Sequence, residues 1–159
     1  MKTSVRPPQS AVKVQNSEFS VFVVDDDESF LFPFSYHLKK DTGWKVFCYG
    51  SAEECLCHLH LNPRVIVMDY FFNRAGENNI DGMTALRLIK SMRPEIPVVM
   101  ISAQDEIAVS MELLRAGAFT YIVKDRQAFH SIEQSLQSLR SVIHSRALVT
   151  KKSSSKRND

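Results

Sequence analysis

The sequence predicts an α/β fold in which a five-stranded parallel sheet is covered by helices on both faces. Five short apolar runs of four to six residues are too short for buried helices and are expected to form strands. Segments whose apolar residues recur at helical spacing separate these runs, so strands and helices alternate along the chain. This alternation is typical of a parallel sheet with both faces covered, because each crossover lays a helix over the sheet.

The first strand is expected at residues 19–24, a run rich in Val and Phe. Residues 1–18 precede it without periodicity and are expected to form a disordered arm. Asp27 is placed to cap the first helix, which Gly43 ends. Pro33 would remove a hydrogen bond from a helix that begins at residue 28, so we expect regular helix to start a few residues later.

The second strand is expected at residues 44–49, and Ser51 is placed to cap the helix that follows it. The third strand covers residues 65–68, after an Asn-Pro break. A polar loop over residues 70–81 comes next. The third helix follows Gly82, because apolar residues then recur at the spacing of one helix face.

The fourth strand is expected at residues 97–101, and Asp105 is placed to cap a fourth helix that a left-handed Gly117 ends. The fifth strand covers residues 119–123. The last helix carries one apolar stripe, made of Phe129, Ile132, Leu136, Leu139 and Ile143. We expect the folded unit to span residues 19–146 and a flexible basic tail to follow at 147–159.

Size and charge narrow the possible functions. A chain of 159 residues fits one domain, and its net charge of +2 comes from basic tails around an acidic body. The body has no basic stripe, so we expect no direct binding of nucleic acid. No apolar stretch is long enough to span a bilayer, and no secretory leader is recognisable, so we expect a cytoplasmic protein without membrane insertion. The three cysteines are then expected to be reduced thiols.

Polar side chains stand where the apolar runs stop. Asp25 and Asp26 follow the first run, Asp69 the third, Ser102 the fourth and Lys124 the fifth. Because the carboxyl ends of parallel strands meet at one edge of a sheet, these side chains are expected to converge there. Carboxylates, a hydroxyl and an amine at one place suit the binding of a divalent cation and the handling of a phosphoryl group.

Clustered carboxylates repel one another unless a cation or a proton compensates them. Magnesium suits such a cluster, because it takes a few carboxylate ligands and keeps several waters. The ordinary alternative for the acidic run at Asp25, Asp26 and Asp27 is a helix cap, and the run alone favours neither. Asp69, an acid that directly follows a buried strand, favours the metal site, because an unused acid there is costly.

Asp69 has a chemical use in such a site, since a carboxylate can accept a phosphoryl group as an acyl phosphate. Lys124 would supply a cation to the phosphoryl oxygens and Ser102 a hydrogen bond. Each has an ordinary alternative: Asp69 a cap or turn, Lys124 an exposed lysine, Ser102 a serine at a strand end.

Taken together, five motifs in order resemble the receiver domain of bacterial two-component response regulators. The motifs are Val23-Val24-Asp25-Asp26, Val67-Met68-Asp69, Ile80-Asp81-Gly82, Val99-Met100-Ile101-Ser102-Ala103 and Tyr121-Ile122-Val123-Lys124. The resemblance covers about residues 19–146. It implies a flavodoxin-like (βα)5 fold with strand order 2-1-3-4-5.

The resemblance also implies roles for the residues at the carboxyl edge. Asp69 matches the phosphoacceptor of the family. Asp26 and Asp69 match direct Mg²⁺ ligands, with the backbone carbonyl of Phe71 as a third ligand and Asp25 acting through water. Lys124 matches the lysine that contacts the phosphoryl group.

The expected partners and output follow from the same resemblance. Ser102 and Tyr121 match a switch pair that repositions the surface of the fourth helix, fifth strand and fifth helix. The phosphoryl donor would be a sensor histidine kinase or a histidine phosphotransfer protein, and a downstream protein target or a phosphorelay would receive the signal. Because the tail after the last helix is short, we expect a stand-alone receiver without enzymatic turnover beyond weak self-dephosphorylation.

The chain departs from the family pattern at three places. The loop after Asp69 is longer than usual, with thirteen positions to Gly82, and lacks the usual Met-Pro pair. Asp125 stands where a proline usually follows the lysine. Phe71 and Gln104 lie two positions after Asp69 and Ser102, where they can change the lifetime of an acyl phosphate.

Two other functions remain open from the sequence. The first is a phosphorylation-independent adaptor on the same fold, against which the intact set of site residues argues. The second is a Mg²⁺-dependent phosphohydrolase with an aspartyl-phosphate intermediate. Haloacid dehalogenase-like enzymes require a second acid two residues after the nucleophile, where this chain has Phe71.

Overall fold

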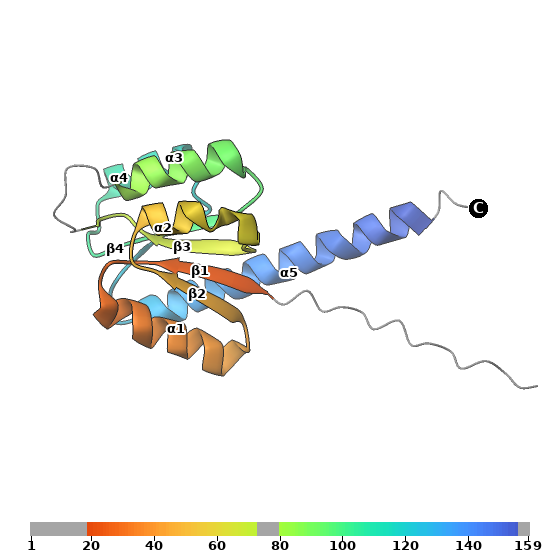
Figure 1. Ribbon diagram of the computed structural model, residues 1–159, viewed down its shortest axis with the longest axis horizontal. Helices are drawn as coiled ribbons and strands as arrows, with labels where there is room; N and C mark the ends of the chain where they lie inside the picture. The colour runs from red at the N-terminus through yellow and green to blue at the C-terminus, as the bar shows by residue number, and fades with distance from the viewer. Residues whose placement is uncertain (1–18, 73–79, 156–159) are drawn as a thin grey trace, which may run out of the picture.

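The computed structural model describes residues 19–72 and 80–155, with side chains up to Ser145. Strands and helices alternate as predicted (Figure 1). The strands are β1 (Ser20–Val24), β2 (Lys45–Tyr49), β3 (Val65–Asp69), β4 (Val98–Ser102) and β5 (Thr120–Val123). The helices are α1 (Glu28–Thr42), α2 (Ala52–Cys57), the 3-10 turn η1 (Leu59–Leu61), α3 (Gly82–Met92), α4 (Ile107–Arg115) and α5 (Ala128–Ser155).

The five strands form one parallel sheet in the order β2-β1-β3-β4-β5, which confirms the predicted fold class and strand order. The order reverses direction between β1 and β3. Asp25 and Asp69 follow or end these two strands. Ligands of open α/β sheets bind beside such a switch point, at the carboxyl ends of the strands.

Each face of the sheet has its own apolar core, because side chains alternate along a strand. One core packs α1 and α5 against the sheet through Val21, Val23, Val67, Val99, Ile101, Phe34, Leu38, Ile132 and Leu136. The other packs α2, α3 and α4 against the sheet through Phe22, Val24, Ile66, Met68, Met100, Cys55, Leu86, Ile89 and Leu113. Full burial of one large apolar side chain stabilises the fold by about 1.5–3 kcal/mol.

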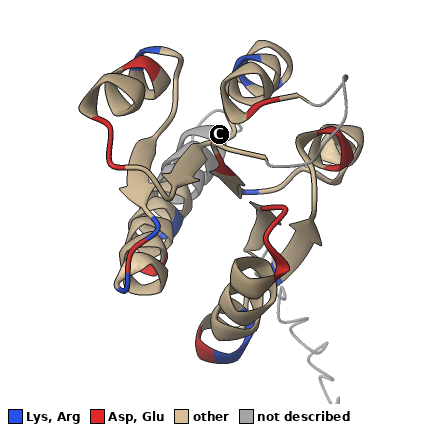
Figure 2. Ribbon diagram, turned by 90° about the vertical axis from the view of Figure 1, so that its left-hand side faces the viewer, with Lys and Arg blue, Asp and Glu red and all other residues tan. Residues whose placement is uncertain are grey.

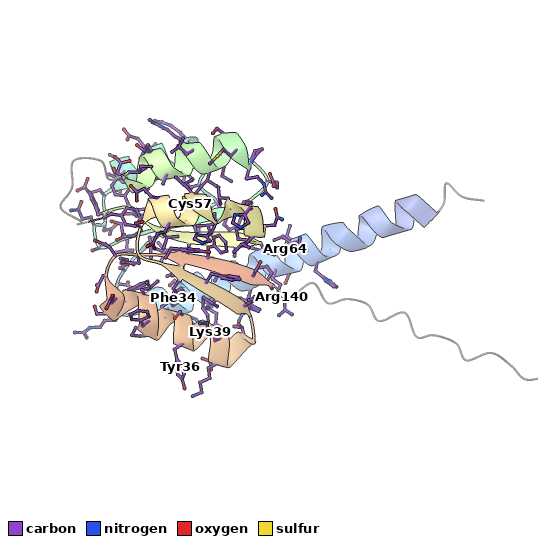
Figure 3. All side chains as sticks on the ribbon, in the orientation of Figure 1. Phe34, Tyr36, Lys39, Cys57, Arg64 and Arg140 are labelled. Atoms are coloured by element: carbon purple, nitrogen blue, oxygen red, sulfur yellow. The ribbon has the colours of Figure 1, made fainter. Side chains whose placement is uncertain are left out.

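Helix α1 begins where its cap predicts but includes a proline. The Asp27 carboxylate accepts a hydrogen bond from the Ser29 N–H at 2.9 Å, and Gly43 ends the helix with φ of 68°. The expectation that regular helix starts after Pro33 was wrong, because α1 runs from Glu28 through Pro33. Pro33 lies in the first half of the helix. The buried Phe34 (Figure 3) and Leu38 of the same helix pack in the core against the sheet and anchor α1 there.

The predicted cap at Ser51 is confirmed, since its side chain accepts a hydrogen bond from the Glu54 N–H. The predicted cap at Asp105 was wrong. Helix α4 begins one residue later, with Glu106 at the capping position and no side-chain hydrogen bond there. Gly117 has a positive φ of 100°, in agreement with its predicted left-handed conformation.

Helix α5 is longer than predicted. Ile132, Leu136 and Leu139 of its apolar stripe are buried, but the helix continues past residue 146 to Ser155 and extends beyond the body (Figure 1). The expected tail at 147–159 is therefore helical through Ser155. The expected arm at 1–18, the loop segment 73–79 and residues 156–159 lie outside the described residues. Within the described ranges, no helix combines the length and apolarity that crossing a bilayer requires.

Candidate functional site

The polar residues predicted to converge do lie together at the carboxyl edge of the sheet. Asp25 and Asp26 directly follow β1, Asp69 ends β3, Ser102 ends β4 and Lys124 directly follows β5. Figure 2 looks toward this edge, where acidic and basic segments lie beside each other near its centre.

The ladder of backbone hydrogen bonds continues past the strands and fixes these positions. The N–H of Asp25 donates to the carbonyl of Tyr49 at 3.0 Å, and the N–H of Lys124 donates to the carbonyl of Ser102 at 2.7 Å. Both functional side chains therefore start from backbone that the neighbouring strand holds in place.

Lys124 joins the two most buried carboxylates of the edge. Its Nζ lies 2.6 Å from Oδ2 of Asp25 and 3.0 Å from Oδ2 of Asp69. Asp25 is 0% exposed and Asp69 is 5% exposed, so both ion pairs are largely shielded from water. Taking acids into such a site is costly without a partner, and Lys124 is the ion-pair partner of both.

Burial changes the acid strength of all three groups. It raises the pKa of Asp69 to about 6, with the charge of Asp25 adding to the rise and the Lys124 ammonium opposing it. Burial also raises the pKa of Asp25, against the opposing effect of Lys124. Burial alone would lower the pKa of Lys124, but the two carboxylates outweigh it and the pKa is raised.

The carboxylates also form a group that suits a hard cation. Oxygen atoms of Asp25, Asp26 and Asp69 lie within 4.8 Å of one another. When all three are ionised they exceed the single ammonium of Lys124 by two negative charges, which a divalent cation would neutralise. The donor set is all oxygen, as Mg²⁺ and Ca²⁺ prefer. Among the described residues, no other group of three or more His, Cys, Asp or Glu side chains lies close enough together to hold a metal ion.

Ser102 and Tyr121 are linked through one residue. Ser102 is fully buried, and its Oγ accepts a hydrogen bond from the Gln104 N–H at 3.1 Å. The hydroxyl of Tyr121 donates a hydrogen bond to the carbonyl of Gln104. Both members of the predicted switch pair thus contact the backbone of the loop between β4 and α4.

Phe71 contributes through its backbone while its side chain faces solvent. Its ring is 40% exposed, and a backbone hydrogen bond from Phe71 to the Asp69 carboxylate stabilises the charged form of that acid. The peptide bond between Lys124 and Asp125 is trans, and the N–H that a proline would lack donates to the carbonyl of Val123 at 2.9 Å.

Two residues at the site were not predicted to act there. Gly82 starts α3 so close to the end of β3 that an added Cβ would lie 2.6 Å from the carbonyl oxygen of Asp69. The centre of the Phe30 ring lies 4.8 Å from Lys124 Nζ. The glycine of the Asp81-Gly82 motif was a sequence signal for the first contact, whereas no pattern in the sequence pairs Phe30 with Lys124.

Comparison with known proteins agrees with this geometry. The sequence profile of the response regulator receiver domain matches residues 21–137. An NtrX-like response regulator of Rickettsia conorii is 30% identical over 109 residues, which make up 68% of this chain and 22% of that protein. The regulatory protein AtoC of Escherichia coli is 30% identical over 108 residues, or 65% of this chain and 22% of that protein. The chain spans about a fifth of the length of these relatives.

Solved structures share the fold. The receiver domain of the Francisella response regulator 1452 superposes with a TM-score of 0.69 at 22% identity, covering 78% of this chain and 98% of that chain. A CheY-like receiver domain protein of Methanospirillum hungatei gives a TM-score of 0.63 at 22% identity, with the same coverage. NtrX of Brucella abortus gives 0.69 at 25% identity, covering 84% of this chain and 29% of that chain.

Proposed function

The chain belongs to the response regulator receiver family, and from this premise we propose that Asp69 accepts a phosphoryl group in a Mg²⁺-dependent reaction. One observation supports the proposal most strongly: the Lys124 ammonium joins the buried carboxylates of Asp69 and Asp25, and the half-buried Asp26 completes a group of three acids. An ordinary surface cluster would need neither the burial nor the lysine.

Asp69 acts as the nucleophile. With a pKa of about 6 it is mostly ionised at neutral pH, and a bound cation would favour ionisation further. One of its oxygens forms a bond to phosphorus while the bond from phosphorus to the donor atom breaks, and the electron pair leaves with the donor. With phosphohistidine the imidazole nitrogen leaves, and with acetyl phosphate the acetate oxygen leaves.

The Mg²⁺ site is proposed at Asp25, Asp26 and Asp69, with the backbone carbonyl of Phe71 as a further ligand. When bound, the ion would offset negative charge on the phosphoryl oxygens. Lys124 supplies the second cation at the same oxygens, and its place between Asp25 and Asp69 supports this role. Ser102, buried at the end of β4, is the proposed hydrogen-bond donor to the new group.

The proposed output is a change in the surface of α4, β5 and α5. When the Ser102 hydroxyl turns toward the phosphoryl group it leaves the Gln104 N–H, and the same residue holds Tyr121. The surface next to this loop exposes apolar side chains, which suit a protein partner. They are Ile107, Met111, Leu114 and Phe119.

A sensor histidine kinase or a histidine phosphotransfer protein is the proposed donor, and a downstream protein or a phosphorelay the proposed recipient, in the cytoplasm. Absence of direct nucleic-acid binding stays a prediction. The adaptor alternative also stays open, because it uses the same fold without the chemistry. The exposed Phe71 side chain, at the position of a second catalytic acid, disfavours the phosphohydrolase.

Incubation with acetyl phosphate and Mg²⁺, followed by the mass of the intact chain, tests the proposal. We expect one added phosphoryl group on the natural chain, none on Asp69→Asn and one on Asp105→Asn, which changes an exposed acid near the same edge. We expect a chelator to block the addition. Failure of labelling with acetyl phosphate and with a phosphohistidine donor would support the adaptor. Continuous release of phosphate from small esters would support the hydrolase.

A further inference from the structure

Lys124 has a third neighbour besides its two carboxylates. Its Nζ lies 4.8 Å from the centre of the Phe30 ring, within the distance at which an aromatic face attracts a cation. We propose that Phe30 is a positioning residue, which holds the Lys124 ammonium by a cation–π interaction where it can meet the phosphoryl group. This inference rests on the proposed phosphoryl acceptance at Asp69.

The structure holds Phe30 firmly in place. Its backbone N–H donates to the carbonyl of Asp27 at 3.0 Å, in the first turn of α1. Its ring packs against Phe34 of the same helix, with centroids 5.5 Å apart, and edge-on against Phe129 of α5 at 5.4 Å. The ring that faces Lys124 is therefore braced from two helices, which limits its motion.

The cation–π interaction attracts the Lys124 ammonium independently of the charge on the carboxylates. Asp25 and Asp69 hold Lys124 only while they keep their own charge and position. On phosphorylation the ammonium has to exchange a carboxylate oxygen for a phosphoryl oxygen. The charge of the Phe30 ring face does not change in that step, so the ring can keep the ammonium close before and after it. Such preorganisation raises rate by reducing the motion that the reaction requires.

Fluorination of Phe30 distinguishes the electrostatic attraction of the ring from the space that the ring fills. Fluorine atoms on a phenylalanine ring withdraw charge from its face and weaken cation–π attraction while the ring keeps nearly its size. We expect the rate of phosphoryl acceptance from acetyl phosphate to fall stepwise with one, two and three fluorines at position 30, reaching a loss of about threefold to tenfold. Phe30→Leu, which has no ring, should lose at least as much.

The matched control places trifluorophenylalanine at position 22. Phe22 is fully buried in the core on the other face of the sheet and contacts Phe47 and Tyr49. A general effect of fluorination on folding would slow both proteins, whereas the proposal predicts a rate within about twofold of the natural chain at position 22 and the stepwise loss at position 30.

A second measurement does not depend on phosphorylation. In the unmodified chain, the methylene protons of Lys124 beside Nζ should show an upfield ring-current shift in proton NMR. Phe30→Leu should remove that shift, and trifluorophenylalanine at position 30 should reduce it, because the weaker attraction lets the ammonium move away from the ring.

The two measurements give distinguishable outcomes. If the natural chain accepts no phosphoryl group but the ring-current shift is present, the proposed function fails and the contact between Phe30 and Lys124 stands without its proposed role. If the chain is phosphorylated at an equal rate with zero and three fluorines, Phe30 does not position Lys124 by cation–π attraction. Absence of the shift in the natural chain would overturn the contact itself.

Discussion

Two basic side chains of this molecule each lie between two acids, but at different depths. Lys124 lies between Asp25 and Asp69 at the carboxyl edge, where the two acids are at most 7% exposed at their side chains. These three groups come from the ends of three different strands, β1, β3 and β5.

The second arrangement lies between α1 and α5. Nδ1 of His37 is 2.8 Å from Asp41 and Nε2 is 2.8 Å from Glu133, with side-chain exposures of 30%, 46% and 16% in that order. Both arrangements touch the same aromatic cluster, since Phe34 and Phe129 pack against Phe30 on one side and His37 on the other.

Burial decides how much a contact between a basic side chain and an acid contributes. Water solvates the groups around His37 even when the pairs break, so their contribution to stability is small. The acids beside Lys124 have no such alternative, and breaking one pair leaves a charge buried. The deep arrangement therefore keeps Asp25, Asp69 and Lys124 at shifted pKa values, where they can bind another cation or a phosphoryl group. The shallow arrangement connects α1 and α5.

Removal of the buried cation should have the largest effect. We expect Lys124→Met to lower the free energy of unfolding by about 3–5 kcal/mol at pH 7 without divalent ions, because Asp25 and Asp69 lose their partner. Urea unfolding followed by circular dichroism measures it. Lys39→Met, an exposed lysine that points away from the body on α1, should change stability by less than about 0.5 kcal/mol (Figure 3). Equal losses of stability in the two variants would contradict the claim that the buried ion pairs of Lys124 stabilise the fold more than an exposed lysine does.

The pH dependence of stability should come from the deep arrangement. The pKa of Asp69 is raised from 3.8 to about 6, so between these values the folded state holds a proton that the unfolded state has released. Stability should then fall as pH rises through this window, by up to about 3 kcal/mol without metal.

Unfolding measured in urea between pH 4 and 7 tests this sign. Asp69→Asn should reduce the slope and leave the part that comes from the raised pKa of Asp25. Mg²⁺ at ten times its dissociation constant should add about 1.4 kcal/mol at pH 7. A natural chain that gains stability from Asp69 as pH rises through this window would contradict the raised pKa.

Disturbing the close backbone contact between Gly82 and the end of β3 should lower stability by less than the loss of Lys124, but by a measurable amount. An alanine at position 82 would place its Cβ within 2.8 Å of backbone atoms of Asp69 and Tyr70, so α3 or the end of β3 has to move. We expect Gly82→Ala to destabilise by about 2 kcal/mol and to slow phosphoryl acceptance. Thr84→Ala in the same helix turn serves as the control. If Gly82→Ala accepts the phosphoryl group at the natural rate and unfolds with the natural stability, position 82 has room for a side chain and the account of this contact is wrong.

The shallow arrangement should show the smallest effect. We expect His37→Gln to lower stability by less than about 1 kcal/mol, because its acids are partly solvated once the imidazole is gone. The same urea experiment measures it. A loss of stability as large as that of Lys124→Met would mean that the contact between His37 and Glu133 is the main interaction that holds α1 against α5.

Part of this structure could be predicted from the sequence. Short apolar runs and the polar residues after them located every strand and brought Asp25, Asp69 and Lys124 to one edge, because parallel strands must share that edge. The strand order required the resemblance to a known family, since the pattern of runs alone does not distinguish the possible orders.

Other features could not be predicted because they depend on contacts between distant segments. Pro33 is tolerated inside α1, whose neighbouring side chains are buried against the sheet. The capping position of α4 is Glu106 and not the predicted Asp105, a difference of one residue that capping preference does not settle. The contact of Phe30 with Lys124 joins residues of α1 and the loop after β5, and no local pattern connects them.

The most direct test locates the phosphoryl group on the chain. After reaction with acetyl phosphate and Mg²⁺, rapid proteolysis and mass spectrometry should find the added group on the peptide that contains Asp69, and nowhere when a chelator is present. A group found on a histidine or serine peptide instead, or on the Asp69 peptide in equal yield without divalent ions, would contradict the account of the carboxyl edge.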